Sequence, residues 1–195
     1  MADEKAVTIK RKTRETEVTV RLVLEGMRHI QVDTGIGFYD HMLITLAFWA
    51  GWDLDVTCKG DLQVDTHHSV EDVALALGQA FSQAREDIGE IERFGWSLVP
   101  LDEALTQVSV DLSGRPFWVV DARLQTERVG TFETAMTGHF FRSFATEARM
   151  TLHVRNMYGG NDHHIIETMF KGLGMALRQA LLPRKGGVGS TKGML

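Results

Sequence analysis

The sequence lacks the features that mark secreted, disulfide-rich or membrane-spanning proteins. It contains a single cysteine, Cys58, so no disulfide framework can form and a reducing compartment is expected. The longest apolar run, residues 42–52, is too short to cross a bilayer. The first residues, MADEKAVTIKRK, contain no apolar signal region. We therefore expect a cytoplasmic protein with no membrane partner.

Several common catalytic motifs are missing as well. There is no His-Glu-x-x-His, Gly-x-Ser-x-Gly or Cys-x-x-Cys motif. Gly35 and Gly37 lack the final glycine and the strand-to-helix setting of a dinucleotide-binding fingerprint. A net charge of -5 argues against a nucleic-acid partner. With 44% hydrophobic and 24% charged residues, the composition is that of an ordinary globular protein.

What the sequence does contain is a repeated His-His-x-x-Glu motif. On a helix, residues three and four apart share a face, whereas adjacent histidines point about 100° apart and cannot easily chelate one ion together. Each motif therefore predicts ligands for two different metal ions, with one imidazole binding each ion. The two copies are Asp65, His67, His68 and Glu71, and His163, His164 and Glu167.

The motif belongs to a longer internal duplication. His41 corresponds to His139, and after it the alternating pair Leu54 and Val56 corresponds to Leu152 and Val154. The two His-His-x-x-Glu motifs follow in the same order. The common order of these matches predicts two similar halves, residues 1–92 and 93–195, that form one compact unit.

Each half is predicted to read strand, strand, helix, strand, helix. The first helices are expected at residues 40–50 and 138–148. Apolar stripes with helical period predict the second helices, over residues 70–88 and over residues 166–180 ahead of Pro183. The fold class is therefore α+β, with a small, mostly antiparallel sheet and two helices on one of its faces in each half. The tail, residues 184–195, is Gly-rich and without periodicity.

The candidate metal ligands are six histidines and two carboxylates, which divide into two sets of three His and one Glu. Imidazole and carboxylate together suit Mn, Fe, Co, Ni or Zn, and the sequence leaves the choice of ion open. It also leaves open which histidine of each pair binds which ion. The candidates are His41, His67, His68, Glu71, His139, His163, His164 and Glu167.

Cations and further carboxylates add to this pattern. Arg93, Arg115, Lys171 and the tail residues Ser190 and Lys192 together suggest an anionic, phosphorylated substrate. Asp102 lies ahead of a predicted strand, where a helix N-cap would explain it as well as catalysis does. Glu15 follows a basic stretch, residues 10–14.

These segments resemble the imidazoleglycerol-phosphate dehydratase family over nearly the whole chain. The matching motifs are TGIGFYDHML (34–43), DTHHSVED (65–72), LDEAL (101–105), DLSGRPF (111–117), NDHHIIE (161–167), FK (170–171) and STKG (190–193). No Asp-x-Asp-x-Thr phosphatase segment is present, so the resemblance is to the single-activity form.

The resemblance implies loss of water from imidazole glycerol phosphate to give imidazole acetol phosphate in histidine biosynthesis. It implies two Mn²⁺ ions per active site, and a closed homo-oligomer of about 24 subunits with sites between chains. A metal-bound imidazolate would expel the adjacent hydroxyl and give a diazafulvene-like intermediate. Proton transfer and positioning would fall to Glu15, Glu167, Lys171 and Asp102. Arg93, Arg115, Ser190 and Lys192 match the phosphate-holding positions of the family.

Two other functions remain open at this point. Paired metals with phosphate-binding cations also suit a two-metal phosphoesterase, although such sites are usually rich in carboxylates. A structural or storage assembly could use the histidine motifs as clasps between subunits. That alternative leaves Arg115, Lys171 and the Ser-Thr-Lys tail without a role.

Overall fold

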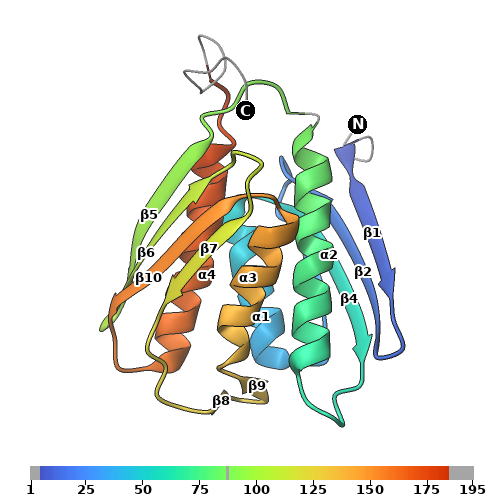
Figure 1. The fold of residues 1–195 in the computed structure, drawn as a ribbon, viewed down its shortest axis with the longest axis vertical. Coiled ribbons are helices and arrows are strands. Elements are labelled where there is room, and N and C mark those ends of the chain that lie inside the picture. Colours follow the sequence, from blue (N-terminus) through green and yellow to red (C-terminus); the bar gives the residue numbers. More distant parts are fainter. Residues whose placement is uncertain (1–4, 87, 185–195) are drawn as a thin grey trace.

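The computed structural model describes residues 5–86 and 88–184, which form two four-stranded sheets with four helices between them (Figure 1). The first half contains β1 (Val7–Lys12), β2 (Thr16–Val23), β3 (Ile30–Asp33), α1 (Gly37–Ala50), β4 (Asp53–Gly60) and α2 (His67–Glu86). The second half contains β5 (Phe94–Leu101), β6 (Ala104–Asp111), β7 (Phe117–Asp121), β8 (Arg128–Val129), β9 (Phe132–Glu133), α3 (Met136–Glu147), β10 (Thr151–Tyr158) and α4 (Asp162–Ala180).

The two sheets have the same topology, which confirms the α+β class and the internal duplication. Their strand orders are β1-β2-β4-β3 and β5-β6-β10-β7. In each sheet the first two pairings are antiparallel and the last is parallel. Val20 pairs with Val56 in the first sheet as Val108 pairs with Val154 in the second. Each half is therefore a mostly antiparallel sheet, as expected.

The helices lie between the sheets and join the two halves. α2 packs on β1 and β2, and α4 packs on β5 and β6, so each sheet is covered on one face (Figure 1). Across the interior, α1 lies along α4 and α2 lies along α3. Buried aromatic rings fill this contact: Tyr39 meets Phe140, and Phe81 meets Phe144, each pair with ring centroids 5.9 Å apart. Burial of such large apolar side chains stabilises the pairing of the halves.

The predicted helices are present, but the strand count was too low. The first half contains one more strand than expected, β3, and the second half contains three more, β7 and the two-residue strands β8 and β9. β3 alternates between half-buried and exposed residues but has only four of them, and β7 is exposed at four of its five positions, so neither gives a clear strand pattern in the sequence. The first helices begin at Gly37 and Met136, slightly before the predicted residues.

Asp102 does not cap a helix. It lies with Glu103 in the tight turn between β5 and β6, where its φ angle is 45°. A short polar side chain tolerates this left-handed conformation. Among the described helices, none has both the length and the apolar character to cross a membrane. Residues 185–195, which include Ser190 and Lys192, lie outside the described part of the chain.

Candidate metal centre

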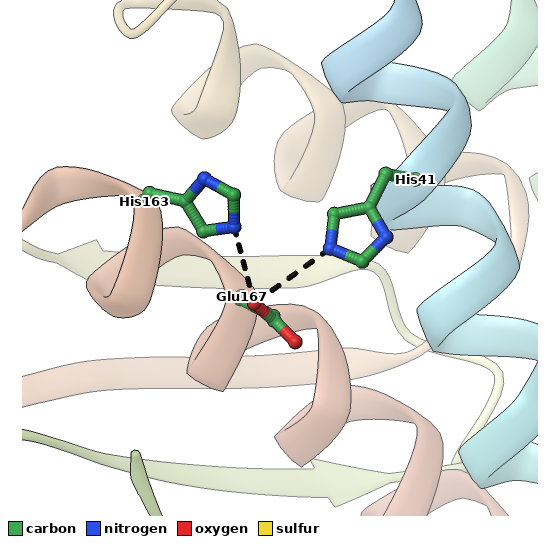
Figure 2. A group of neighbouring side chains, drawn as sticks. All are labelled: His41, His163 and Glu167. Atoms are coloured by element: carbon green, nitrogen blue, oxygen red, sulfur yellow. Dashed lines mark ion pairs between the residues drawn. The ribbon is translucent and has the colours of Figure 1, made fainter. Parts of the chain in front are cut away.

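Helices from both halves bring the first group of predicted ligands together. His41 of α1 faces His163 and Glu167 of α4 (Figure 2). The Nε2 atoms of His163 and His41 lie 3.3 Å and 3.7 Å from Glu167 Oε2. All three ligand atoms lie within 4.8 Å of one another. We call His41, His163 and Glu167 cluster 1.

A second group repeats this arrangement with the roles of the halves exchanged. His67 and Glu71 of α2 face His139 of α3, and their ligand atoms again lie within 4.8 Å of one another. His67 Nε2 lies 3.6 Å from Glu71 Oε2, and the rings of His67 and His139 have centroids 4.6 Å apart. We call His67, Glu71 and His139 cluster 2. The duplication has therefore produced two related clusters, each built from both halves of one chain.

Local sequence explains how the helices present these side chains. Asp65 accepts a hydrogen bond from the backbone N–H of His67, and Asn161 accepts one from that of His163. These side chains satisfy donors at the starts of α2 and α4. The glutamate four residues after the first histidine then lies on the same helical face. Each motif so places one imidazole and one carboxylate side by side.

Lys171 adds a positive charge to cluster 1. Its Nζ lies 2.8 Å from Glu167 Oε1, while Glu167 Oε2 faces the two histidines. Burial raises the pKa of Glu167, but the hydrogen bond and charge of Lys171, with help from His41 and His163, outweigh it and lower the pKa below its usual value. Glu167 is therefore a carboxylate over a wide pH range, as a metal ligand or a base must be. The predicted shared face of Glu167 and Lys171 is present.

The second histidine of each pair points away from its neighbour. We call these two residues, His68 and His164, the outward histidines. The ring centroids of His67 and His68 lie 6.1 Å apart, as do those of His163 and His164. His68 Nδ1 lies 3.1 Å from both carboxylate oxygens of Asp61, and His164 Nδ1 lies 2.9 Å from Glu103 Oε2. With a proton on Nδ1, a neutral ring keeps its lone pair on Nε2. The structure thus brings together six of the eight predicted ligands and leaves His68 and His164 outside both clusters.

The carboxylates that hold these two rings also affect their protonation. The hydrogen bond to Asp61 raises the pKa of His68, and the one to Glu103 raises that of His164. In return, the hydrogen bond from His164 lowers the pKa of Glu103 to about 2, with further help from backbone N–H groups. Sequence reasoning assigned no role to Asp61 or Glu103. The sequence signals that could have pointed to them were their positions. Asp61 lies shortly before the first His-His-x-x-Glu motif, and Glu103 lies in the LDEAL segment.

The predicted phosphate-binding arginines meet at the other end of the molecule. Arg93 donates to both carboxylate oxygens of Asp111, at 2.6 Å and 3.0 Å, and Arg115 Nη2 lies 3.8 Å from the same carboxylate. The Arg93 side chain is 12% exposed, whereas that of Arg115 is 73% exposed. Asp111, four residues before Arg115, was not predicted. The backbone N–H of Arg93 donates to the carbonyl of Ala180, at the end of α4 farthest from cluster 1.

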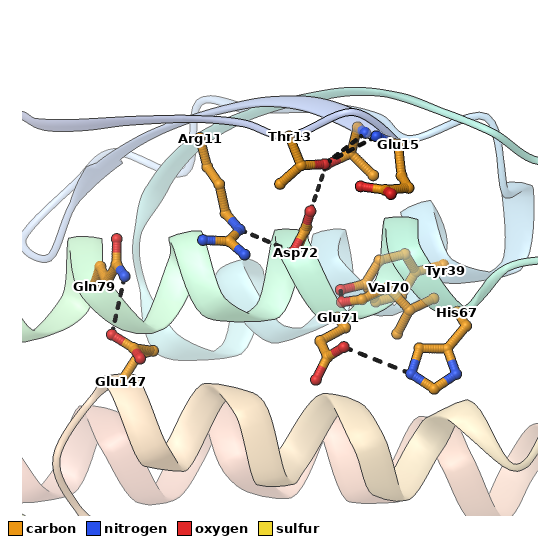
Figure 3. Close-up of polar contacts among 11 residues, drawn as sticks. Arg11, Thr13, Glu15, Tyr39, His67, Val70, Glu71, Asp72, Gln79 and Glu147 are labelled. Carbon is orange, nitrogen blue, oxygen red and sulfur yellow. Dashed lines mark hydrogen bonds and ion pairs between the residues drawn. The ribbon is translucent and has the colours of Figure 1, made fainter.

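The remaining predicted proton-transfer groups lie beside the outward histidines. Asp102 Oδ2 is 3.9 Å from His164 Nε2. Glu15, in the hairpin between β1 and β2, is close enough to His68 for its charge to act on that ring. In Figure 3, Glu15 and the His67–Glu71 pair lie on opposite sides of α2. Neither Asp102 nor Glu15 therefore faces a cluster of its own chain.

Both clusters fit a divalent transition metal. Each offers two imidazole nitrogens and one carboxylate oxygen from rigid helices, and such mixed N and O donors suit Mn, Fe, Co, Ni or Zn. Three protein ligands leave coordination positions for a substrate or for a further side chain. Each cluster can therefore hold an ion and leave a position open for a small molecule.

Comparison with known proteins identifies the relatives of this chain. A profile of the imidazoleglycerol-phosphate dehydratase family matches residues 34–177. The imidazoleglycerol-phosphate dehydratase of Acidothermus cellulolyticus is 52% identical over 96% of this chain and 92% of its own length. That of Thermoanaerobacter pseudethanolicus is 52% identical over 96% of this chain and 97% of its own length.

Solved structures agree with these sequence matches. The crystal structure of imidazoleglycerol-phosphate dehydratase from Staphylococcus aureus has a TM-score of 0.84 at 34% identity, covering 92% of this chain and 99% of that chain. The structure of the Pyrococcus furiosus protein has a TM-score of 0.82 at 37% identity, covering 96% and 100%.

Fold, clusters and relatives together define the class of this protein as a hydro-lyase, an enzyme that eliminates water from its substrate. More narrowly, the chain belongs to the imidazoleglycerol-phosphate dehydratase family, which is metal-dependent and acts in histidine biosynthesis.

Proposed function

We propose that this chain converts D-erythro-imidazole glycerol phosphate to imidazole acetol phosphate with two Mn²⁺ ions per active site. The observation that carries the proposal is the pair of His–Glu clusters, each with ligand atoms within 4.8 Å of one another. Imidazole nitrogen outnumbers carboxylate oxygen in both clusters, which favours a dehydratase over a phosphoesterase. The single Cys58 and the small-molecule substrate support the cytoplasm as the compartment.

The reaction explains why such a centre is needed. The proton to be removed lies on a carbon without an adjacent carbonyl, so an ordinary base faces a high barrier. When bound, the metal ions supply Lewis-acid chemistry that favours the anionic form of the substrate imidazole. An electron-rich ring can expel the hydroxyl of the adjacent carbon and give a diazafulvene-like intermediate, in which the neighbouring C–H is more acidic.

The chain's own residues would then move the protons. Glu167, itself a member of cluster 1, is kept ionised by Lys171 and can accept a proton there. Glu15 and Asp102, beside the outward histidines, are the other proton-transfer or positioning groups. Cluster 1 and cluster 2 would each hold one metal ion, and an outward histidine would complete each set of ligands.

The outward histidines and the arginines support an active site shared between chains. The distance along α4 from Glu167 to Ala180 is about 20 Å. The backbone of Arg93 is hydrogen-bonded to Ala180. A substrate made of an imidazole ring, three carbons and a phosphate cannot span that distance. The arginines of one chain would therefore hold the phosphate of a substrate bound at another chain's clusters. This geometry supports a homo-oligomer, and the family resemblance suggests about 24 copies in a closed assembly.

A dehydration assay tests the proposed activity. With Mn²⁺ and imidazole glycerol phosphate, the protein should form a keto product that is detected by its ultraviolet absorbance. A chelator should abolish the activity, and added Mn²⁺ should restore it. Release of inorganic phosphate without the keto product would instead favour a phosphoesterase. Metal-dependent assembly of folded protein without any turnover would favour a structural clasp.

Replacement of Arg115 by alanine should mainly weaken substrate binding. The loss of a charged hydrogen-bond donor to phosphate costs about 1.5–3 kcal/mol, so we expect KM to rise roughly 10- to 100-fold. Steady-state kinetics would show a smaller change in kcat. Lys5→Ala, which removes an exposed cation from the start of the chain, is the matched control and should leave KM unchanged. An unchanged KM for Arg115→Ala would remove this residue from the phosphate site.

A further inference from the structure

The two halves hold their outward histidines in the same way but with carboxylates from different places. In the second half, Glu103 at the tip of the β5–β6 hairpin holds His164. In the first half, Asp61 in the loop after β4 holds His68. The duplication alone would predict the same holder in both halves. The same contact of a carboxylate with histidine Nδ1 is therefore made by residues from different elements in the two halves.

The counterpart of Glu103 in the first half is Glu15. Val20 and Val108 occupy equivalent positions, because they pair with the equivalent residues Val56 and Val154. Glu15 lies five residues before Val20, and Glu103 lies five residues before Val108. Each is thus at the tip of the first hairpin of its half, near the outward histidine.

The second half has no counterpart of Asp61. The loop after β10 begins with Gly159 and Gly160, and a Cβ on Gly159 would lie only 2.7 Å from Ile165 Cγ1. Glu103 occupies this region instead, and accepts hydrogen bonds from the backbone N–H groups of Gly160 and Asn161 at 3.2 Å and 2.8 Å. These bonds fix its carboxylate against His164.

The Glu15 carboxylate, unlike that of Glu103, is not held by such hydrogen bonds. Within residues 5–86 and 88–184, its carboxylate makes no hydrogen bond or ion pair, although its backbone N–H donates to Thr13. Figure 3 shows the Glu15 carboxylate beside α2 with no contact drawn to it. Asp61 holds the His68 ring with both of its oxygens 3.1 Å from Nδ1.

We propose that Asp61 is a positioning residue that holds His68 in place of Glu15 and so leaves the Glu15 carboxylate available for proton transfer. Glu103 is the positioning residue of the second half, fixed to His164 and not a proton carrier. Duplication produced two equivalent glutamates, and the acquisition of one extra acid separated their roles. This inference rests on the proposed function and assigns separate tasks to two acids beside its active site.

The test compares Mn²⁺ affinity, measured by calorimetry on the assembled protein, with kcat. In Asp61→Ala, Glu15 should replace Asp61 at His68, as Glu103 does at His164. Mn²⁺ affinity should then change by less than about threefold, while kcat falls about 10²- to 10⁴-fold because the proton carrier is occupied. Glu15→Ala should lower kcat similarly and leave the affinity unchanged. Only the double variant should lose affinity, by about 10- to 100-fold.

Glu103→Ala provides the contrasting case, because among the described residues Glu103 is the one acid bonded to His164 Nδ1. This single change should lower Mn²⁺ affinity about 10- to 100-fold. Asp61→Asn keeps an acceptor for the Nδ1 proton and should retain both affinity and kcat, which separates loss of the contact from failure to fold. Asp55→Ala, which removes a half-buried acid of β4 that pairs with Arg21, is the control and should change neither quantity.

Two results would overturn the assignment. One is a loss of Mn²⁺ affinity in Asp61→Ala as large as that in Glu103→Ala, since Glu15 would then be unable to replace Asp61. The other is a loss of affinity in Glu15→Ala alone, since Glu15 would then already hold His68. The comparison of Mn²⁺ affinities among these variants does not require that the protein turn over its substrate. Failure of the proposed function would appear separately, as an absence of dehydration by the unchanged protein.

Discussion

Replacing His163 with alanine is expected to abolish dehydration and to lower Mn²⁺ affinity by more than about 100-fold. Loss of a residue that only orients a metal ligand typically costs 10- to 100-fold in affinity, so loss of the ligand itself should cost at least as much. His163 Nε2 lies 3.3 Å from Glu167 Oε2 at the centre of cluster 1. Metal analysis after gel filtration, together with the dehydration assay, would measure both effects.

His29→Ala is the matched control for this experiment. His29 is exposed and lies outside both clusters, and within residues 5–86 and 88–184 only its backbone groups form hydrogen bonds. Its loss should therefore change neither metal content nor kcat. Circular dichroism would confirm that both variants are folded. Retention of two ions per chain by His163→Ala would show that cluster 1 is not a metal site.

The clusters could be predicted from the sequence because their chemistry depends on short spacings. The i, i+4 relation of His163 and Glu167 is fixed by the helix, and so is that of Glu167 and Lys171. The duplication then indicated that His41 and His139 play equivalent parts. The sequence did not show which helices meet, and the structure places α1 against α4 and α2 against α3. Such contacts depend on packing over the whole chain.

Residues that act through tertiary contacts were harder to predict. Glu103 reaches His164 because a hairpin tip lies beside the start of α4, and the two residues are 61 positions apart. Asp111 holds Arg93 because β5 and β6 are paired there. Neither relation has a periodicity that a sequence reveals. The strands β3 and β7 were missed for a related reason, since β3 alternates over only four residues and β7 is mostly exposed.

Adjacent histidines that serve different active sites should complement each other in trans, and this is the second large effect that we expect. His163→Ala removes a member of cluster 1, and in the proposed shared site His164→Ala removes a ligand that one chain offers to another. Each variant alone should be inactive. When the two are co-expressed with different tags and purified as mixed assemblies, a site is intact if its cluster comes from one variant and its outward histidine from the other. With random mixing, about half of the sites have an intact cluster 1, and about half of those also receive an intact outward histidine. About a quarter of all sites should therefore recover.

The control pairs two variants of the same cluster. His163→Ala and Glu167→Gln both damage cluster 1, so no mixed site can be whole, and the assembly should stay inactive. The double variant His163→Ala/His164→Ala mixed with unchanged protein calibrates the fraction of sites expected from random assembly. If His163→Ala and His164→Ala failed to complement in assemblies shown to contain both chains, the two histidines would serve one and the same site. The active site would then have to close within a single chain, which would require rearrangement of the Asp61 and Glu103 contacts that now hold the outward rings.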